Sequence, residues 1–198
     1  MEKSAFFAEA RYDLSGPLAG IRVVEATTTW AGPMAGCVLA DFGATVIKVE
    51  HPEGEVLRRV PPTYEDSKLS LFHETVNRNK QNVSLNLRHP EGRRLFLALC
   101  AEADVMIENF KPGTLAAMGL GYERLREMRP DIILCSISAL GQSGPLAELP
   151  GYDFIAQAYS GITSMIGETD GTPYIPPVGL GDVGTGVHAA LAVLAALR

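Results

Sequence analysis

The chain has 198 residues, of which 46% are hydrophobic and 20% charged, so it can bury one sizeable core and has the composition of a globular protein. A formal net charge of −6 argues against a nucleic-acid-binding surface as the main function. The longest apolar stretch, Val187 to Leu197, contains His188 and is too short to span a bilayer. We therefore expect a soluble protein that enters no membrane and binds no nucleic acid.

The three cysteines and the N-terminus indicate the compartment. Cys37, Cys100 and Cys135 are widely spaced, and each lies in an apolar run, so we expect reduced core residues of a cytoplasmic protein. Their spacing does not match a metal site, and we predict none. The first 16 residues contain too many acids and too short an apolar run for a signal peptide.

The first predicted unit is a strand, a helix and a second strand. IRVVE (21–25) and TVIKVE (45–50) are β-branched runs, and the segment between them has helical spacing that ends at Gly43. Short connections predict parallel strands, and ligands bind beyond the carboxyl ends of such strands. Trp30 and His51 are therefore ligand candidates by position. The alternatives are a packing aromatic for Trp30 and a solvated turn for His51.

The rest of the chain continues this alternation. Residues 53–81 are polar and predict an irregular excursion that holds one helix, and Pro90 is suited to the first position of a later helix. Gly161 breaks a helical segment that starts at Tyr152. The pattern totals about four strands alternating with helices, a doubly wound α/β fold. Further strand runs are Asn82–Leu87, Val105–Asn109 and Ile132–Ser138.

The segment GLGDVGTG (179–186) places one acid, Asp182, where an apolar helix begins. Read by itself, this acid is best interpreted as a helix N-cap, and Asp153 has the same alternative at the start of its own helix. The glycines also match G-x-G-x-x-G. That fingerprint fails on its context, because TPYIPPV is a poor strand and no ribose-binding acid can follow at the required distance.

Seven segments in the same order resemble one known family. They are WAGPMAG, GATVIKVEHPEGEVLRR, NRNKQNVSLNLRHPEG, DVMIENFKPGTLAAMGLGYERL, RPDIILCSISALGQSGP, LPGYDFIAQAYSG and VGLGDVGTGVHAALAVLAAL. Together they resemble the N-terminal half of the class III CoA-transferases, the CaiB/BaiF or formyl-CoA transferase-like family. The resemblance implies a Rossmann-like large domain with a mostly parallel sheet, truncated here, and an interlocked homodimer at full length. Residues 1–16 are then an N-terminal extension, and 17–198 are the N-terminal part of the large domain.

The resemblance also implies a function and a site. Asp182 corresponds to the nucleophile, which attacks an acyl-CoA thioester to give an aspartyl anhydride and then an aspartyl-CoA thioester, from which a carboxylic acid takes CoA. Glycine N–H groups near Asp182 are expected to stabilise the oxyanion. The implied CoA contacts are Trp30, Ala31, His51, Leu85, Asn86, Leu87, Arg88, Asn109, Phe110, Lys111, Tyr152 and Asp153.

Three features leave alternatives open. Members often carry Arg where this chain has His51, and Arg58 or Arg59 can substitute for it at a phosphate. An α-methylacyl-CoA racemase shares the fold, but it pairs the aspartate with a histidine at the place of Tyr152, whose reference pKa of about 10 makes it unsuitable as a base at neutral pH. The third alternative is a truncated, non-catalytic CoA-binding fragment.

Overall fold

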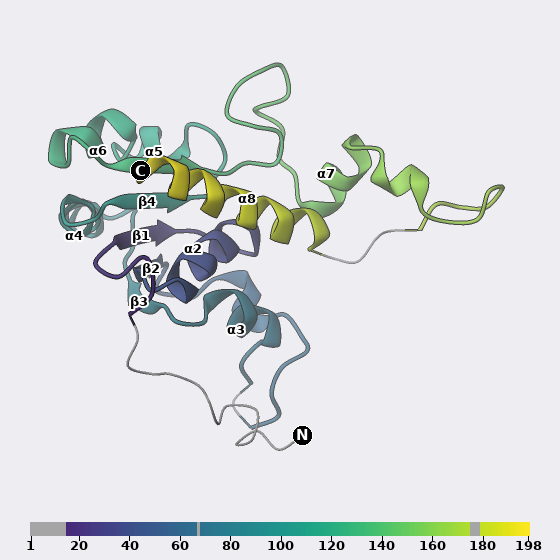
Figure 1. Cartoon of the computed structure of the whole chain (residues 1–198), viewed down its shortest axis with the longest axis horizontal. Coiled ribbons are helices and arrows are strands. Elements are labelled where there is room, and N and C mark those ends of the chain that lie inside the picture. Colours follow the sequence, from purple (N-terminus) through teal and green to yellow (C-terminus); the bar gives the residue numbers. More distant parts are fainter. Residues whose placement is uncertain (1–14, 67, 175–178) are drawn as a thin grey trace.

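The computed structural model describes residues 15–66, 68–174 and 179–198 (Figure 1). Most of the predicted N-terminal extension and the end of TPYIPPV lie outside these residues. In the described ranges five parallel strands form one sheet in the order β3-β2-β1-β4-β5. The doubly wound α/β prediction is confirmed, and each of the five runs identified in the sequence forms a strand, one more than the predicted total of about four. The strands are β1 (Arg22–Ala26), β2 (Thr45–Glu50), β3 (Gln81–Ser84), β4 (Val105–Glu108) and β5 (Ile133–Ser136).

The strand order reverses between β1 and β4, which is the topological switch point of such sheets. The register keeps the carboxyl ends level, because Ala26 pairs with Glu108, and Glu108 pairs with Ser136. The loops that follow β1, β4 and β5 therefore leave the sheet at one edge. A crevice outside this edge is where ligands bind in open parallel sheets.

Helices α2 (Ala31–Asp41) and α8 (Leu180–Ala196) cover one face of the sheet (Figure 1). Their contact depends on small residues. A Cβ atom added at Gly186 would lie 2.6 Å from Met34 Cβ and 2.7 Å from the Ala31 carbonyl oxygen, so only glycine permits this approach. Leu39, Val193 and Val105 belong to the core beneath these helices.

Helices α4 (Pro90–Ala101), α5 (Thr114–Ala117) and α6 (Tyr122–Met128) belong to the opposite face. Pro90 occupies the start of α4 as predicted. Phe96, Met106 and Leu125 are fully buried in this second core, and each such side chain contributes about 1.5 to 3 kcal/mol to stability. The two cores hold the sheet rigid behind its carboxyl edge.

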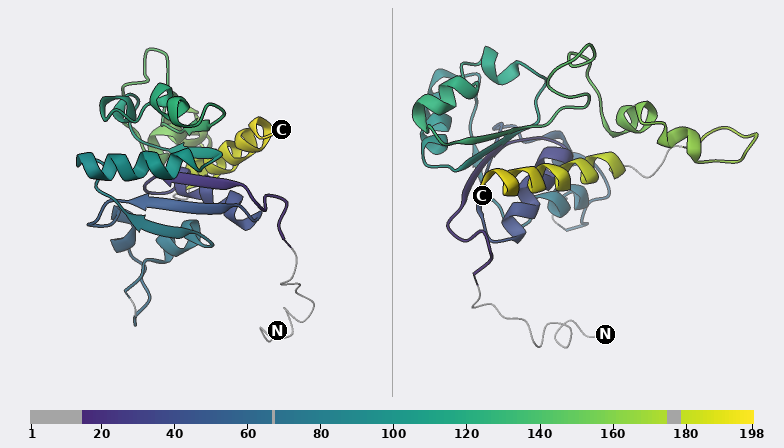
Figure 2. Two further views of the ribbon diagram at one scale, coloured as in Figure 1. Left: turned by 90° about the vertical axis from the view of Figure 1, so that its left-hand side faces the viewer. Right: turned by 45° about the horizontal axis from the view of Figure 1, so that its top comes forward.

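The remaining elements lie around that edge. The predicted excursion contains the 3-10 helix η1 (Val56–Arg59) and α3 (Leu71–Asn77). Helix α7 (Asp153–Tyr159) and the 3-10 helix η2 (Ile162–Met165) are separated at Gly161 as predicted, and they project away from the sheet (Figure 2). None of the helices in the described ranges combines the length and apolar character needed to cross a bilayer.

Candidate functional site

Two neighbouring cavities open at the carboxyl edge of the sheet. The first has a volume of about 550 Å³ and lies among the loops after β1, β4 and β5 and the first turns of α7 and α8. The second, of about 450 Å³, lies beyond β1, β2 and β3. Thr28, Gly54, Glu55 and Phe110 line both cavities, so the two spaces are adjacent and share a wall.

The predicted site residues divide between these cavities. Asp182 lies in the first cavity, and the residues implied as CoA contacts there are Ala31, Asn109, Phe110, Lys111, Tyr152 and Asp153. The second is lined by His51, Leu85, Asn86, Leu87, Arg88 and again Phe110. The fold thus brings together, at one edge of the sheet, segments that are more than a hundred residues apart.

Trp30 lines neither cavity. Its ring packs edge to face against Phe72, with ring centroids 5.0 Å apart, and a Cβ atom added at Gly179 would lie 2.8 Å from it. Trp30 therefore packs behind the start of α8, as in the packing alternative. A contact between Trp30 and CoA stays a prediction.

Asp182 lies in the first turn of α8 and is half-buried. Burial, together with the negative charge of Asp153, raises the pKa of Asp182 to about 6. Glu55, Lys111 and Tyr152 are the other titratable side chains that line its cavity. At neutral pH the Asp182 carboxylate is ionised yet more basic than an ordinary aspartate, which suits a nucleophile.

The N-cap interpretations of both aspartates are wrong. Gly179, with φ of 89°, is the N-cap of α8, and Tyr152 is the N-cap of α7. Instead, Asp153 caps α8, the helix that carries Asp182. Its Oδ1 accepts hydrogen bonds from the N–H groups of Gly181 (2.7 Å) and Asp182 (3.0 Å), and its Oδ2 accepts one from Gly179 (2.9 Å).

These bonds change one expectation about the reaction. The N–H groups of Gly179 and Gly181 already donate to Asp153, so neither is free to stabilise an oxyanion. Helix α2 presents an alternative, because Ala31 lines the cavity and no side chain caps this N-terminus. N–H groups in a first helical turn lack intrahelical acceptors and favour a negative charge.

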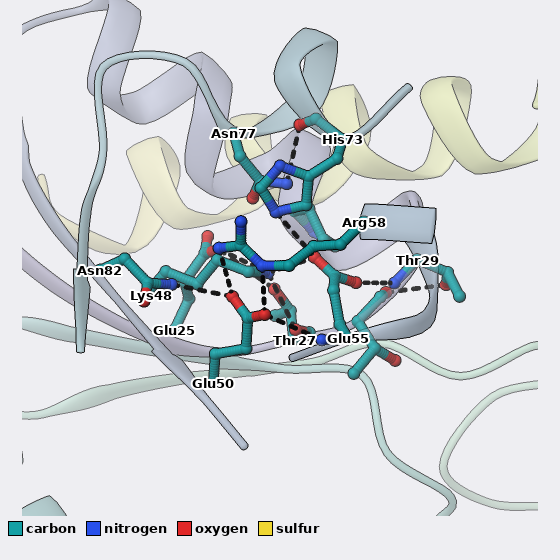
Figure 3. Close-up of polar contacts among 12 residues, drawn as sticks. Glu25, Thr27, Thr29, Lys48, Glu50, Glu55, Arg58, His73, Asn77 and Asn82 are labelled. Atoms are coloured by element: carbon teal, nitrogen blue, oxygen red, sulfur yellow. Dashed lines mark hydrogen bonds and ion pairs between the residues drawn. The ribbon is translucent and has the colours of Figure 1, made fainter. Parts of the chain in front are cut away.

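A buried ionic network supports the loop after β1 (Figure 3). Lys48 Nζ donates to the Thr27 carbonyl oxygen at 3.0 Å and lies 3.1 Å from Glu55 Oε1. Glu55 Oε2 accepts the N–H of Thr29 at 2.7 Å, which holds Thr29 at a positive φ of 57°. A β-branched residue is strained in that conformation and persists in it only when its surroundings enforce it.

The network continues beneath α2. Glu25 Oε1 accepts a 2.8 Å bond from Lys80, which also donates to the Pro33 carbonyl oxygen. On the other side of the loop, Thr28 and Asn109 exchange two hydrogen bonds of 2.8 Å. Sequence reasoning did not identify Glu25, Lys48 or Glu55. Glu25 and Lys48 each stand in an otherwise largely apolar strand, and this pattern could have indicated them.

Arg58 and Arg59 line neither cavity, and a phosphate contact by either residue in place of His51 stays a prediction. The Arg58 guanidinium is bound to the Glu50 carboxylate, with Nη2 2.8 Å from Oε2, and Arg59 donates to the Glu53 carbonyl oxygen. Burial opposes ionisation of Glu50, but bonds from Arg58, the Glu55 N–H and Asn82 outweigh it and lower the pKa of Glu50 to about 2. Arg58 is therefore committed to an internal ion pair.

Glu50, Glu55 and His73 present the closest approach to a metal-binding set in the described part of the chain, with ligand atoms within 4.8 Å of one another. Both carboxylates already have cationic partners, Arg58 for Glu50 and Lys48 for Glu55. A metal ion would compete with these cations for the same oxygens. In this structure the Glu50 and Glu55 carboxylates therefore serve the ionic network.

Comparison with known proteins identifies the class. The model of CoA-transferase family III matches residues 18–198, so the chain belongs to this family. A CaiB/BaiF family protein from Brucella suis has the same fold, with a TM-score of 0.88 and 42% identity over 93% of this chain and 50% of that one. The family and fold predicted from the seven segments are confirmed.

Two of the curated relatives are named as CoA-transferases of succinate or succinyl-CoA and glutarate. The chain is 46% identical over 187 residues to succinate–glutarate CoA-transferase of Agrobacterium fabrum, covering 91% of this chain and 47% of that protein. It is 42% identical over 182 residues to human succinyl-CoA:glutarate CoA-transferase, covering 91% of this chain and 41% of that one. The chain spans less than half the length of these two relatives.

Proposed function

We propose that this chain is the CoA-binding, nucleophile-bearing part of an acyl-CoA:carboxylate CoA-transferase in which Asp182 is the nucleophile. The observation that carries the proposal is the position of Asp182, in a cavity at the topological switch point, with a pKa raised to about 6. Family membership supplies the reaction type. No observation favours the racemase, because Tyr152 stands where the second base would be needed.

The proposed reaction has two exchanges. The Asp182 carboxylate attacks the thioester carbonyl carbon, and the C–S bond breaks to give an acyl-aspartyl anhydride and CoA thiolate. The thiolate then attacks the aspartyl carbonyl carbon, which releases the donor acid as a carboxylate and leaves an aspartyl-CoA thioester. The acceptor carboxylate repeats these steps in reverse order, so no net proton is taken up.

The two cavities support a binding mode for CoA. Arg88 and His51 supply cationic or hydrogen-bonding groups for phosphates in the second cavity. The thioester must reach Asp182 in the first cavity. The two cavities meet at Gly54 and Phe110, and CoA is proposed to pass from one cavity to the other at this boundary. Gly54 has φ of 80°, so a larger residue there would be strained, and its Cβ atom would lie 3.2 Å from Arg58 Cδ.

The acid substrates are proposed to be dicarboxylates. Relatives are named for succinate, glutarate, malate and mesaconate. Lys111 is the one cationic side chain lining the first cavity among the described residues, and it suits either a phosphate or the carboxylate that does not react. A dicarboxylate presents both a reacting group and a group for such a cation.

The full-length enzyme is proposed to be a cytoplasmic, interlocked homodimer. Leu180, Val183, Val187 and Leu191 form an exposed apolar stripe on α8, which a further part of the fold can cover. Cys37 and Cys100 are buried free thiols, as expected of a protein in a reducing compartment.

Exchange of label between acids tests the proposal. The chain is incubated with succinyl-CoA and isotopically labelled glutarate, and labelled glutaryl-CoA is measured against Asp182→Ala and Asp182→Asn variants. We expect exchange only with Asp182 present; undiminished exchange in the variants would refute the nucleophile. CoA binding without any exchange would instead support the non-catalytic fragment.

A further inference from the structure

The carboxylate of Asp153 is wholly engaged inside the protein. Only 5% of the residue is exposed, and besides the N–H groups of Gly179, Gly181 and Asp182, the side-chain amide of Gln157 donates to it. Its two oxygens thus accept four hydrogen bonds. A ligand could bond to this carboxylate only by displacing one of these donors, so a contact between Asp153 and CoA stays a prediction.

The three backbone hydrogen bonds to Asp153 join α7 to the start of α8, which lies more than 20 residues later in the chain. Asp153 begins α7, whereas its three backbone donors lie at the start of α8, which has no side-chain cap of its own. Hydrogen bonds from backbone N–H groups to a carboxylate are charge-assisted and stronger than neutral ones. The start of α8, including the backbone of Asp182, is therefore held by one side chain from outside the helix.

We infer that Asp153 is a positioning residue for the CoA-transferase reaction: its carboxylate caps α8 from α7 and thereby fixes the backbone of Asp182 with its side chain directed into the cavity. The inference rests on the proposed function of Asp182. A helix start left without this cap would fray, because its first N–H groups would have no partner. Nucleophile geometry is demanding, since small displacements of a reacting group reduce rates strongly.

The proximity of Asp153 to Asp182 also has an electrostatic consequence. Asp153 is the charged neighbour that, after burial, raises the pKa of Asp182. The residue that fixes the nucleophile thus also increases its basicity. Loss of the Asp153 charge should lower the pKa of Asp182, whereas loss of the cap should loosen the start of α8, so the two effects are measured separately.

Two variants divide the functions of Asp153. Asp153→Asn keeps one acceptor oxygen and removes the charge, whereas Asp153→Ala removes both. Glu168→Gln, which neutralises an exposed acid farther along the same projecting arm, is the matched control. Amide hydrogen exchange at Gly181 and Asp182, and the ¹³C NMR titration of the Asp182 carboxyl carbon, are measured on each folded variant, as judged by circular dichroism.

We expect exchange at these amides to accelerate roughly tenfold in Asp153→Ala and less in Asp153→Asn, as the loss of a helix cap implies. The pKa of Asp182 should fall in both variants and stay unchanged in Glu168→Gln. The rate of Asp182 adduct formation at saturating succinyl-CoA should fall by about ten- to a hundredfold in Asp153→Ala, with the succinyl-CoA Kd changed less than about twofold.

The inference would be overturned if both Asp153 variants kept the amide exchange rates and the Asp182 pKa of the wild type. A normal adduct rate combined with a weakened Kd would also overturn it, because Asp153 would then be a ligand-binding residue. If the wild-type chain formed no adduct, the proposed function would fail, but amide exchange and the Asp182 titration would still decide whether Asp153 positions that residue.

Discussion

The backbone N–H of Asp182 donates a 3.0 Å hydrogen bond to the carboxylate of Asp153, so one acid of the site fixes the position of the other. The two acids lie at the starts of different helices, α8 and α7. Their proximity keeps two negative charges in a partly buried cavity. A site that retains such repulsion gains a more basic carboxylate and gives up some stability.

The first prediction concerns the pH dependence of the reaction. Because the pKa of Asp182 is about 6, its ionised fraction falls on acidification below that value. The rate of adduct formation from succinyl-CoA should therefore decline about tenfold for each pH unit below roughly 6. Single-turnover measurements from pH 4.5 to 8 test this. A rate that falls with a midpoint near the ordinary aspartate pKa of 3.8 would contradict it.

The second prediction concerns the stability of an Asp182→Asn variant. The folded-state pKa of about 6 exceeds the ordinary value of 3.8, so the folded state favours the protonated acid. The stabilisation is complete below pH 3.8 and is lost as the pH rises through 6. Above pH 6 the variant should thus be more stable than the wild type, and the difference should shrink towards pH 4. Urea unfolding at both ends of this range measures it; a less stable variant at pH 7.5 would be inconsistent.

The third prediction compares two glycines of α8. A Cβ atom at Gly186 would meet Met34 and Ala31, whereas one at Gly184 has no atom within 4 Å outside the adjoining backbone. Gly186→Ala should lower the free energy of unfolding by about 1 to 3 kcal/mol through overpacking. Gly184→Ala should raise it by about 0.5 to 1 kcal/mol, because alanine costs less entropy in a helix. Equal effects in urea unfolding would contradict this account of the α2–α8 contact.

The fourth prediction concerns the ion pair between the buried Glu50 and the partly exposed Arg58. The pKa of Glu50 is lowered from 4.5 to about 2, so its stabilising effect is present above pH 4.5 and is lost as the pH falls towards 2. Glu50→Gln should cost roughly 2 to 3 kcal/mol at pH 7 after allowance for the partial exposure of Arg58. The difference from the wild type should vanish near pH 2.

A matched exposed pair is the control for this prediction. Glu91 and Arg94 also form an ion pair, but both side chains are more than half exposed. Glu91→Gln should leave the free energy of unfolding unchanged within error, as for most surface pairs. Similar losses in Glu50→Gln and Glu91→Gln would show that burial does not distinguish them.

Local pattern was enough to predict the sheet. Each predicted strand run forms a strand, because apolar β-branched stretches between glycine and proline signals have few other stable arrangements. Collinear motifs correctly indicated the family, and the predicted residues line two adjacent cavities except for Trp30. Whether they bind CoA stays a prediction.

Long-range pairing was not predictable in the same way. Asp153 and Asp182 each looked like the cap of its own helix, since a cap pattern is local, yet Asp153 caps α8 across a separation of 29 residues. Glu55 and Lys48 likewise become a pair only after β2 and η1 are placed in the fold. Side-chain contacts of this kind depend on three-dimensional placement, which a single sequence pattern does not contain.

The central claim is that Asp182 forms a covalent intermediate, and peptide mass spectrometry tests it most directly. The chain is treated with succinyl-CoA, quenched with acid and digested, and the peptide that contains Asp182 is examined for a CoA or succinyl mass increase. We predict the increase on Asp182 in the wild type and none in Asp182→Asn. A modified peptide elsewhere in the chain, or an unchanged increase in the variant, would contradict the account.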